Sequence, residues 1–240
     1  MCKTAIMKIE IWSDIMCPFC YIGKRRFEAA LEKFSHKDKV EVEWKSFLLS
    51  PDVETDPTKN MNQFLAEHKG ISIEEAKQMH AYVTEMAAKS GLQYNFDIAI
   101  PANSFNAHRF LHFAKQHGKQ GEAEEKLFSA YFTEGKNIDD AQTIMAIAAE
   151  LGLDTSALAL AMGSDAFVQD VIADVQEAQQ IGVRGVPFFV FNRKYAISGA
   201  QESDAFLQTL EKAYSEWQAA AQPKLDITEG DSCAPGEECG

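Results

Sequence analysis

Two cysteines separated by two residues are the side chains of this sequence best suited to chemistry. Cys17-Pro18-Phe19-Cys20 follows an alternating apolar segment, residues 7–12, and precedes a stretch with apolar residues at helical spacing. Pro18 suits the first helical position, where an N–H has no partner within the helix. Cys17 then lies at the helix N-terminus, where free N–H groups and the positive end of the dipole stabilise a thiolate. Cys20 follows one turn later on the same side, so we expect it to resolve a mixed disulfide formed by Cys17.

Zinc binding is the alternative chemistry for the same motif. Cys233 and Cys239 could complete a four-thiolate site, although their spacing is wider than is usual for zinc. Pro18 and the strand before it favour redox chemistry. His108 and His112 stand four residues apart, but no third ligand accompanies them, so they are interpreted as core or solvated histidines. We therefore expect neither a metal ion nor a cofactor.

Charged residues flank the motif on both sides. Asp14 precedes Cys17 by three residues, and a carboxylate beside the sulfur would disfavour its thiolate. Asp14 is therefore expected to shape the loop rather than to activate Cys17. Lys24-Arg25-Arg26 begins two turns after Cys17 and is interpreted as a solvated helix face.

The patterns around the motif predict a strand, a helix and a second strand. The second strand, residues 40–47, alternates and ends before Pro51-Asp52. Strand character returns only near the C-terminus, where a hairpin and a last helix are expected. Their predicted ranges are a strand at 186–191, a turn at 192–194, a strand at 195–198 and a helix at 202–221.

Helical periodicity fills the chain from about residue 59 to residue 181. Glycines between the periodic segments indicate C-caps or turns, and Ser72-x-x-Glu75 resembles a capping box. The predicted helices cover residues 61–69, 73–90, 104–118, 122–134, 140–151 and 165–181.

The order of these elements resembles the thioredoxin fold as it occurs in the DsbA family. The resemblance rests on the strand, the Cys-x-x-Cys motif and its helix, the long helical segment, and Gly185-Val186-Pro187 before the hairpin. Three stretches are similar to the cytoplasmic FrnE-like branch of that family: WSDIMCPFCYIG at 12–23, NSFNAHR at 103–109 and GVRGVPFF at 182–189.

This resemblance implies an α/β fold in which a thioredoxin-like βαβ…ββα domain is interrupted by an all-helical insertion domain. Residues 1–58 and 182–221 would form the first domain, residues 59–181 the insertion domain, and residues 222–240 a C-terminal tail. The implied function is that of a thiol–disulfide oxidoreductase acting through a mixed disulfide. The direction of transfer, whether oxidation, reduction or isomerisation, is left open.

The resemblance also assigns residues around the active site. Pro187 would be a cis-proline facing the two cysteines, and Val186, Pro187 and Phe19 would bind an extended substrate segment. Some FrnE-like proteins carry a C-terminal Cys-x5-Cys, and Cys233 and Cys239 match that spacing. We expect this pair to exchange electrons with the active site; the simpler interpretation is a mobile tail with incidental thiols.

Composition limits the partners. The 240-residue chain carries a formal net charge of −13, which repels phosphate backbones and anionic lipids. No apolar run of 18 residues occurs, and the first ten residues lack the features of an export signal. We therefore expect a cytoplasmic protein whose partners are protein or small-molecule disulfides and thiols, with no nucleic acid and no membrane.

Two other functions are compatible with the same fold. A glutathione-dependent isomerase or transferase of the superfamily typically uses one nucleophile or a serine, and the presence of both Cys17 and Cys20 argues against it. A chaperone that binds unfolded chains would keep its activity after loss of both cysteines.

Overall fold

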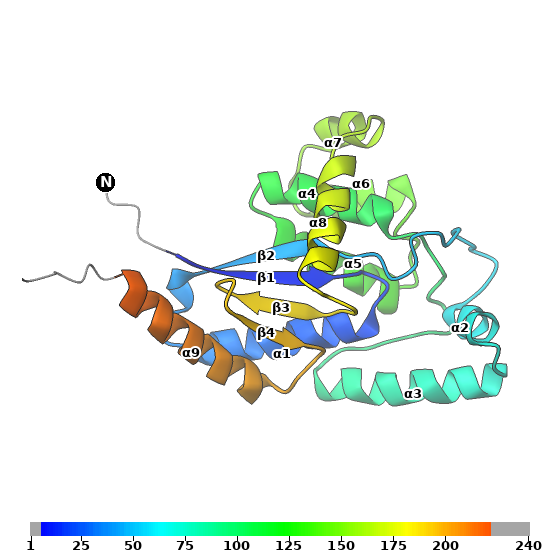
Figure 1. Cartoon of the computed structure of the whole chain (residues 1–240). Helices are drawn as coiled ribbons and strands as arrows, with labels where there is room; N and C mark the ends of the chain where they lie inside the picture. The colour runs from blue at the N-terminus through cyan, green and yellow to red at the C-terminus, as the bar shows by residue number, and fades with distance from the viewer. Residues whose placement is uncertain (1–5, 222–240) are drawn as a thin grey trace, which may run out of the picture.

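A four-stranded mixed sheet lies at the centre of the chain (Figure 1). The computed structural model describes residues 6–221. Strand β1 (Met7–Ser13) runs parallel to β2 (Val40–Ser46), because helix α1 (Pro18–Lys33) carries the chain back between them. Strand β3 (Phe188–Phe191) is antiparallel to β1, and β4 (Tyr195–Ser198) pairs with β3. The strand order is β2-β1-β3-β4.

The hairpin between β3 and β4 turns where the sequence predicted it. Asn192 and Arg193 have positive φ angles of 49° and 55°. Two successive residues with left-handed backbone conformation are typical of a type I′ turn, whose twist matches the twist of paired strands. The hairpin thus adds β3 to the free edge of β1, with Ile9 opposite Phe191.

Helices cover both faces of the sheet. On one face α1 packs against α9 (Ser203–Ala221), and an aromatic cluster joins them to the sheet through Phe27, Phe189 and Phe206. On the other face the helix before β3 covers β1, and its Asp174 carbonyl accepts a hydrogen bond from Trp12 Nε1 at 3.0 Å. Figure 1 shows these two layers below and above the strands. Every residue of β1 except Lys8 is therefore buried, on both faces of the sheet.

The segment between β2 and β3 is helical, as predicted, and its core continues into residues 15–22 of the active-site turn and α1. The capping box of Ser72 and Glu75 is confirmed. A helix at 155–162 was not predicted, because its residues are apolar almost throughout and only Leu158 is buried. The elements are a 3₁₀ turn before β2 (Lys37–Lys39), α2 (Met61–Lys69), α3 (Ile73–Lys89), α4 (Phe105–Gln116), α5 (Gln120–Phe132), α6 (Ala141–Glu150), α7 (Thr155–Met162) and α8 (Val168–Gln180).

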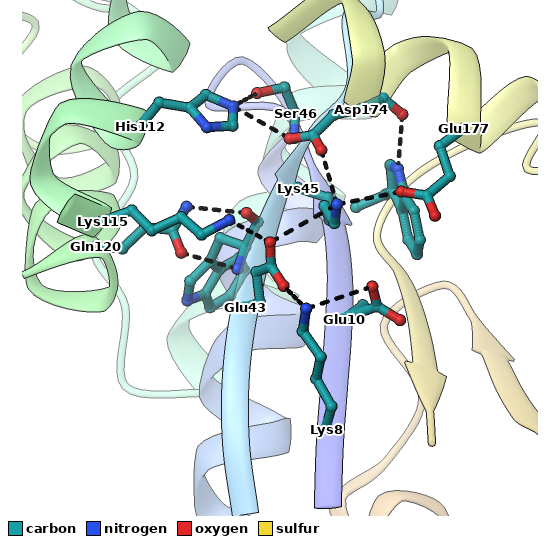
Figure 2. Close-up of polar contacts among 12 residues, drawn as sticks. Lys8, Glu10, Glu43, Lys45, Ser46, His112, Lys115, Gln120, Asp174 and Glu177 are labelled. Atoms are coloured by element: carbon teal, nitrogen blue, oxygen red, sulfur yellow. Dashed lines mark hydrogen bonds and ion pairs between the residues drawn. The ribbon is translucent and has the colours of Figure 1, made fainter. Parts of the chain in front are cut away.

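A layer of paired charges joins β2 to the helices that cover it (Figure 2). Glu43 forms ion pairs with Lys8 of β1 and Lys115 of α4, and Lys45 pairs with Asp174 of α8 at 2.9 Å. Burial by itself would raise the pKa of Glu43, but the surrounding lysines lower it to about 2. Each charge is thus compensated where helix and strand meet.

Lys24 corrects one expectation from the sequence. Its side chain is buried rather than solvated, and its ammonium contacts Glu125 of α5 at 2.7 Å. Arg25 also pairs with Glu125, so this basic segment binds α1 to the insertion.

No helix within residues 6–221 has the length and apolarity needed to cross a membrane. The division into two domains at residues 58 and 181 stays a proposal.

Candidate active site

Cys17 occupies the N-cap of α1, directly before Pro18 at the first helical position. Its backbone is extended (φ −87°, ψ 111°), and its N–H donates to the Asp14 carbonyl at 2.9 Å. The Sγ atom donates to the carbonyl of Val186 at 3.5 Å. The fold therefore brings Cys17 together with a segment 169 residues later in the chain.

Cys20 lies behind Cys17 and is fully buried, and both cysteines are free thiols in this structure. Burial raises the pKa of Cys20 well above its ordinary value, and the neighbouring Cys17 adds to this effect. The neighbouring Asp14 backbone and Ser13 side chain act in the opposite direction and lower this pKa. The net result keeps Cys20 protonated while Cys17 is reduced. The two sulfurs thus have different environments although they lie one helical turn apart.

The loop before β3 approaches α1 very closely. The Val186–Pro187 peptide bond is cis, as the family resemblance implied. Pro187 is buried against Gly23 of α1, and a Cβ atom placed on Gly23 would lie 2.9 Å from Pro187 Cγ. Only a residue without a side chain fits there. A glycine inside a helix pattern was the available sequence signal for this contact.

Phe19, the second residue of α1, is 38% exposed although it is large and apolar. It lies between the two cysteines in sequence and is open to solvent, whereas Pro187 is buried and Val186 is half-buried. The structure therefore leaves Phe19 available for contact, and its role in substrate binding stays a proposal.

Asp14 shapes the loop that leads to Cys17, which confirms the expectation from the sequence. Its Oδ1 accepts a hydrogen bond from the backbone N–H of Met16 at 3.1 Å, and its Oδ2 accepts one from Leu49 at 2.7 Å. The carboxylate therefore holds the loop after β1 to the loop after β2. Both of its oxygens are occupied by backbone N–H groups.

Tyr94, from the loop between α3 and α4, also holds the active-site turn, and the sequence gave no signal for it. Its hydroxyl donates to the carbonyl of Pro18 at 2.7 Å. Burial raises the pKa of Tyr94, and the nearby Cys17 raises it further, so the hydroxyl stays a donor. The helical segment therefore contributes directly to the position of the cysteine turn.

His108 and His112 are both buried in the core. His112 Nε2 lies 3.2 Å from Ser46 Oγ and 3.1 Å from Asp174, as Figure 2 shows. His108 Nε2 lies 3.6 Å from Asp14 Oδ1. Among residues 6–221 no group of three or more His, Cys, Asp or Glu side chains is arranged to hold a metal ion. Cys233 and Cys239 lie outside the described residues, so both interpretations of the tail pair stay predictions.

Comparisons with known proteins agree with this geometry. A model of the DSBA-like thioredoxin domain matches residues 8–211. The protein YwbO of Bacillus subtilis (strain 168) is 32% identical over 215 residues, which cover 88% of this chain and 96% of that protein. The crystal structure of the probable DsbA oxidoreductase SCO1869 from Streptomyces coelicolor is 34% identical, with a TM-score of 0.81 over 96% of this chain and 97% of that one.

A more distant structure shares the fold alone. The cytosolic disulfide reductase DsbM from Pseudomonas aeruginosa, solved with GSH, is 15% identical, with a TM-score of 0.59 over 89% of this chain and 98% of that one. The FrnE-like branch stays a prediction. Because the family model spans most of the sequence and the element order agrees with it, the chain belongs to the DSBA-like thioredoxin domain family of thiol–disulfide oxidoreductases.

Proposed function

We propose that this oxidoreductase exchanges disulfides through Cys17, with Cys20 as the resolving thiol. As a reductase, the Cys17 thiolate attacks one sulfur of a substrate disulfide, that S–S bond breaks, and one substrate thiolate leaves. Cys20 then attacks the Cys17 sulfur, which forms the Cys17–Cys20 disulfide and releases the second substrate thiolate. A dithiol reductant returns the enzyme to its starting state. Starting from the oxidised enzyme, the same steps in reverse oxidise a substrate.

The contrast between the two sulfurs is the observation that supports this assignment most. Cys17 is 4% exposed, caps a helix N-terminus and contacts a carbonyl of the Val186 loop, whereas Cys20 is 0% exposed and has a raised pKa. A sulfur at a helix N-terminus is suited to attack, and a buried thiol one turn later is protected until a mixed disulfide has formed.

Val186, Pro187 and Phe19 are proposed to bind the substrate segment. The Val186 carbonyl already accepts a hydrogen bond from Cys17, so a chain that lies along this loop passes directly over the attacking sulfur. Phe19 supplies an exposed apolar surface beside it. A substrate segment held by backbone hydrogen bonds and apolar contacts can have many different sequences. This suits an enzyme that acts on different protein or small-molecule disulfides.

We also propose that Cys233 and Cys239 form a second redox pair. Eleven residues, 222–232, separate the end of α9 from Cys233, and a chain of that length can span roughly 15–20 Å. Trapping in Cys20→Ser protein is the test: a disulfide from Cys17 to Cys233 or Cys239, identified by mass spectrometry, is expected. If no such bond forms and deletion of residues 231–240 leaves turnover unchanged, the tail thiols are incidental.

The proposed roles are tested by insulin reduction and by refolding of scrambled ribonuclease. Cys17→Ser is expected to abolish both activities, and Cys20→Ser is expected to accumulate mixed disulfides and to lose turnover. Suppression of the aggregation of an unfolded protein that survives both substitutions would instead indicate a peptide-binding chaperone. Activity that needs glutathione and only Cys17 would indicate a glutathione-dependent transferase or isomerase. The cytoplasmic location stays a prediction that cell fractionation can check.

A further inference from the structure

The outer edge of β2 is closed by side chains along only part of its length. The side-chain amide of Gln120 accepts a hydrogen bond from the Trp44 N–H at 3.1 Å and donates one to the Trp44 carbonyl at 2.9 Å. Two residues further along the strand, the Ser46 N–H donates to Asp174 Oδ2 at 3.0 Å. These side chains occupy positions that a neighbouring strand would otherwise fill.

Towards the start of β2 the same edge is open. The backbone groups of every second residue point to the same side of a strand, so Val40 and Val42 face outward as Trp44 does. The Val40 N–H donates to the Lys37 carbonyl. Within residues 6–221, neither the Val40 carbonyl nor the two backbone groups of Val42 bond to a further strand, because β2 ends the sheet. Three backbone groups are therefore free to pair with another strand.

A hollow of about 690 Å³ lies beside this open edge, and we call it the edge groove. Its apolar lining includes Phe27 and Leu31 of α1 and Val42 of β2. Gly118 and Gly121 also line it, and neither has a side chain that could fill it. Its charged lining is balanced, with three basic and three acidic side chains: Lys24, Arg25, Lys126, Glu28, Glu122 and Glu125.

The C-terminal tail contains one segment with the pattern of a strand. Leu225 and Ile227 are the only large apolar residues of the tail, and Asp226 and Thr228 alternate with them. Alternate side chains of a strand face the same side, so Leu225 and Ile227 suit an edge that is apolar on one side. We propose that residues 225–228 dock in the edge groove as a fifth strand, parallel to β2.

A parallel register uses every open backbone group of the edge. Asp226 lies opposite Glu41 in this register. Its N–H donates to the Val40 carbonyl, and its own carbonyl accepts the Val42 N–H. The N–H of Thr228 then donates to the Val42 carbonyl. The two apolar side chains of the segment lie beside the two valines, over the apolar lining of the groove, so that hydrogen bonding and apolar burial favour the same register.

Helix α9 ends at the end of the sheet where such a strand must begin. Ala220 lines a small hollow together with Asn192, and the Asn192 N–H donates to the Lys8 carbonyl at 2.8 Å. Lys8 is paired with Glu41 of β2, so two strand spacings, about 10 Å, separate Asn192 from the open edge. The linking residues 222–224 let the chain cover up to about 13 Å.

The connection also has the hand that parallel strands require. Strand β4 runs parallel to β1 and β2, because β3 is antiparallel to both β1 and β4. Helices α1 and α9 lie on the same face of the sheet (Figure 1), and both connections cross the sheet in the direction of β2. A crossover from β4 through α9 to the tail therefore repeats the hand of β1–α1–β2, and crossovers between parallel strands are almost always right-handed.

Amide hydrogen exchange at Val42, read by NMR on the full chain, tests this docking. The Val42 N–H is expected to exchange about tenfold more slowly in the wild type than in the double variant Leu225→Asp/Ile227→Asp, because charges in place of the apolar side chains release the strand. The double variant Ser232→Asp/Ala234→Asp adds the same charge to the tail outside the strand and is expected to match the wild type. Amides of β1 report that each variant is folded.

Photo-crosslinking identifies what covers the edge. A benzophenone amino acid in place of Ile227 is expected to link, within the same molecule, to peptides that contain Leu31 or Val42. The yield of this link should not depend on protein concentration.

Two results overturn the proposal. One is an exchange rate at Val42 that is the same in the wild type and in Leu225→Asp/Ile227→Asp, whether fast or slow. The other is a crosslink that forms only between molecules, with a yield that rises with protein concentration, because a second copy of the chain then covers the edge.

Discussion

Gly23→Ala tests whether the close approach of the Pro187 loop to α1 controls the reaction at Cys17. The added Cβ would lie 2.9 Å from Pro187 Cγ and 3.3 Å from Phe189 Cζ. Ordinary contact begins near 3.4 Å, so the loop must withdraw by about half an ångström. Overpacking of this kind costs about 1–3 kcal/mol, against a gain of up to ~1 kcal/mol from the better helix propensity of Ala.

Gly121→Ala provides a matched control. Gly121 also lies in a helix, and its Cβ would meet only Trp44 Nε1, at an ordinary 3.7 Å. This variant gains helix propensity without overpacking. Since about 1 kcal/mol shifts the melting temperature of a chain of this size by roughly 2–4 °C, Gly23→Ala is expected to melt roughly 2–12 °C below Gly121→Ala.

The kinetic effect should be confined to Gly23→Ala, because only that change moves the carbonyl of Val186 relative to Cys17. A displacement of 1 Å can cost a hundredfold in rate, so half that distance predicts about a tenfold loss. The measurement is kcat/KM for reduction of a peptide disulfide, with both melting temperatures taken by circular dichroism. The reasoning is refuted if both Gly variants have the same melting temperature and kcat/KM stays within about twofold of the wild type.

Three further results are expected. Brief iodoacetamide treatment of the reduced protein near neutral pH should modify Cys17 before Cys20, because burial raises the pKa of Cys20; faster labelling of Cys20, read by peptide mass spectrometry, would reverse their roles. Glu43→Gln should destabilise the protein at neutral pH but not near pH 2. The folded-state pKa of Glu43 is about 2, below its ordinary 4.5. The stabilisation by its charge is therefore complete above pH 4.5 and is lost as the pH falls through 2. Equal urea midpoints for variant and wild type at pH 7 would contradict this. Tyr94→Phe removes the hydrogen bond to the Pro18 carbonyl and should lower the free energy of unfolding by about 1 kcal/mol in urea titrations, whereas an unchanged value would mean that this bond adds nothing to stability.

Local patterns were sufficient for most of the secondary structure. The helix at 61–69 and the strand at 195–198 were predicted with their observed bounds, since caps and turn residues mark both ends. Helix α7 was missed because an apolar run with one buried residue has no amphipathic period, although Asp154 caps it with two hydrogen bonds. Lys24 was assigned to solvent because its acidic partner Glu125 is 101 residues away in sequence.

The sequence by itself determined that two thiols stand one helical turn apart, because Cys-Pro-Phe-Cys at a strand-to-helix turn needs only local geometry to place them. It also determined the α/β element order, since period-two and period-three-to-four patterns are local properties. Tertiary structure alone decided which groups surround the thiols. Tyr94 reaches the Pro18 carbonyl from the helical segment, and the Val186 carbonyl lies against Cys17 from the loop before β3, across separations that no short pattern encodes. The fixed position of the turn and the burial of Cys20 exist only when those segments pack together.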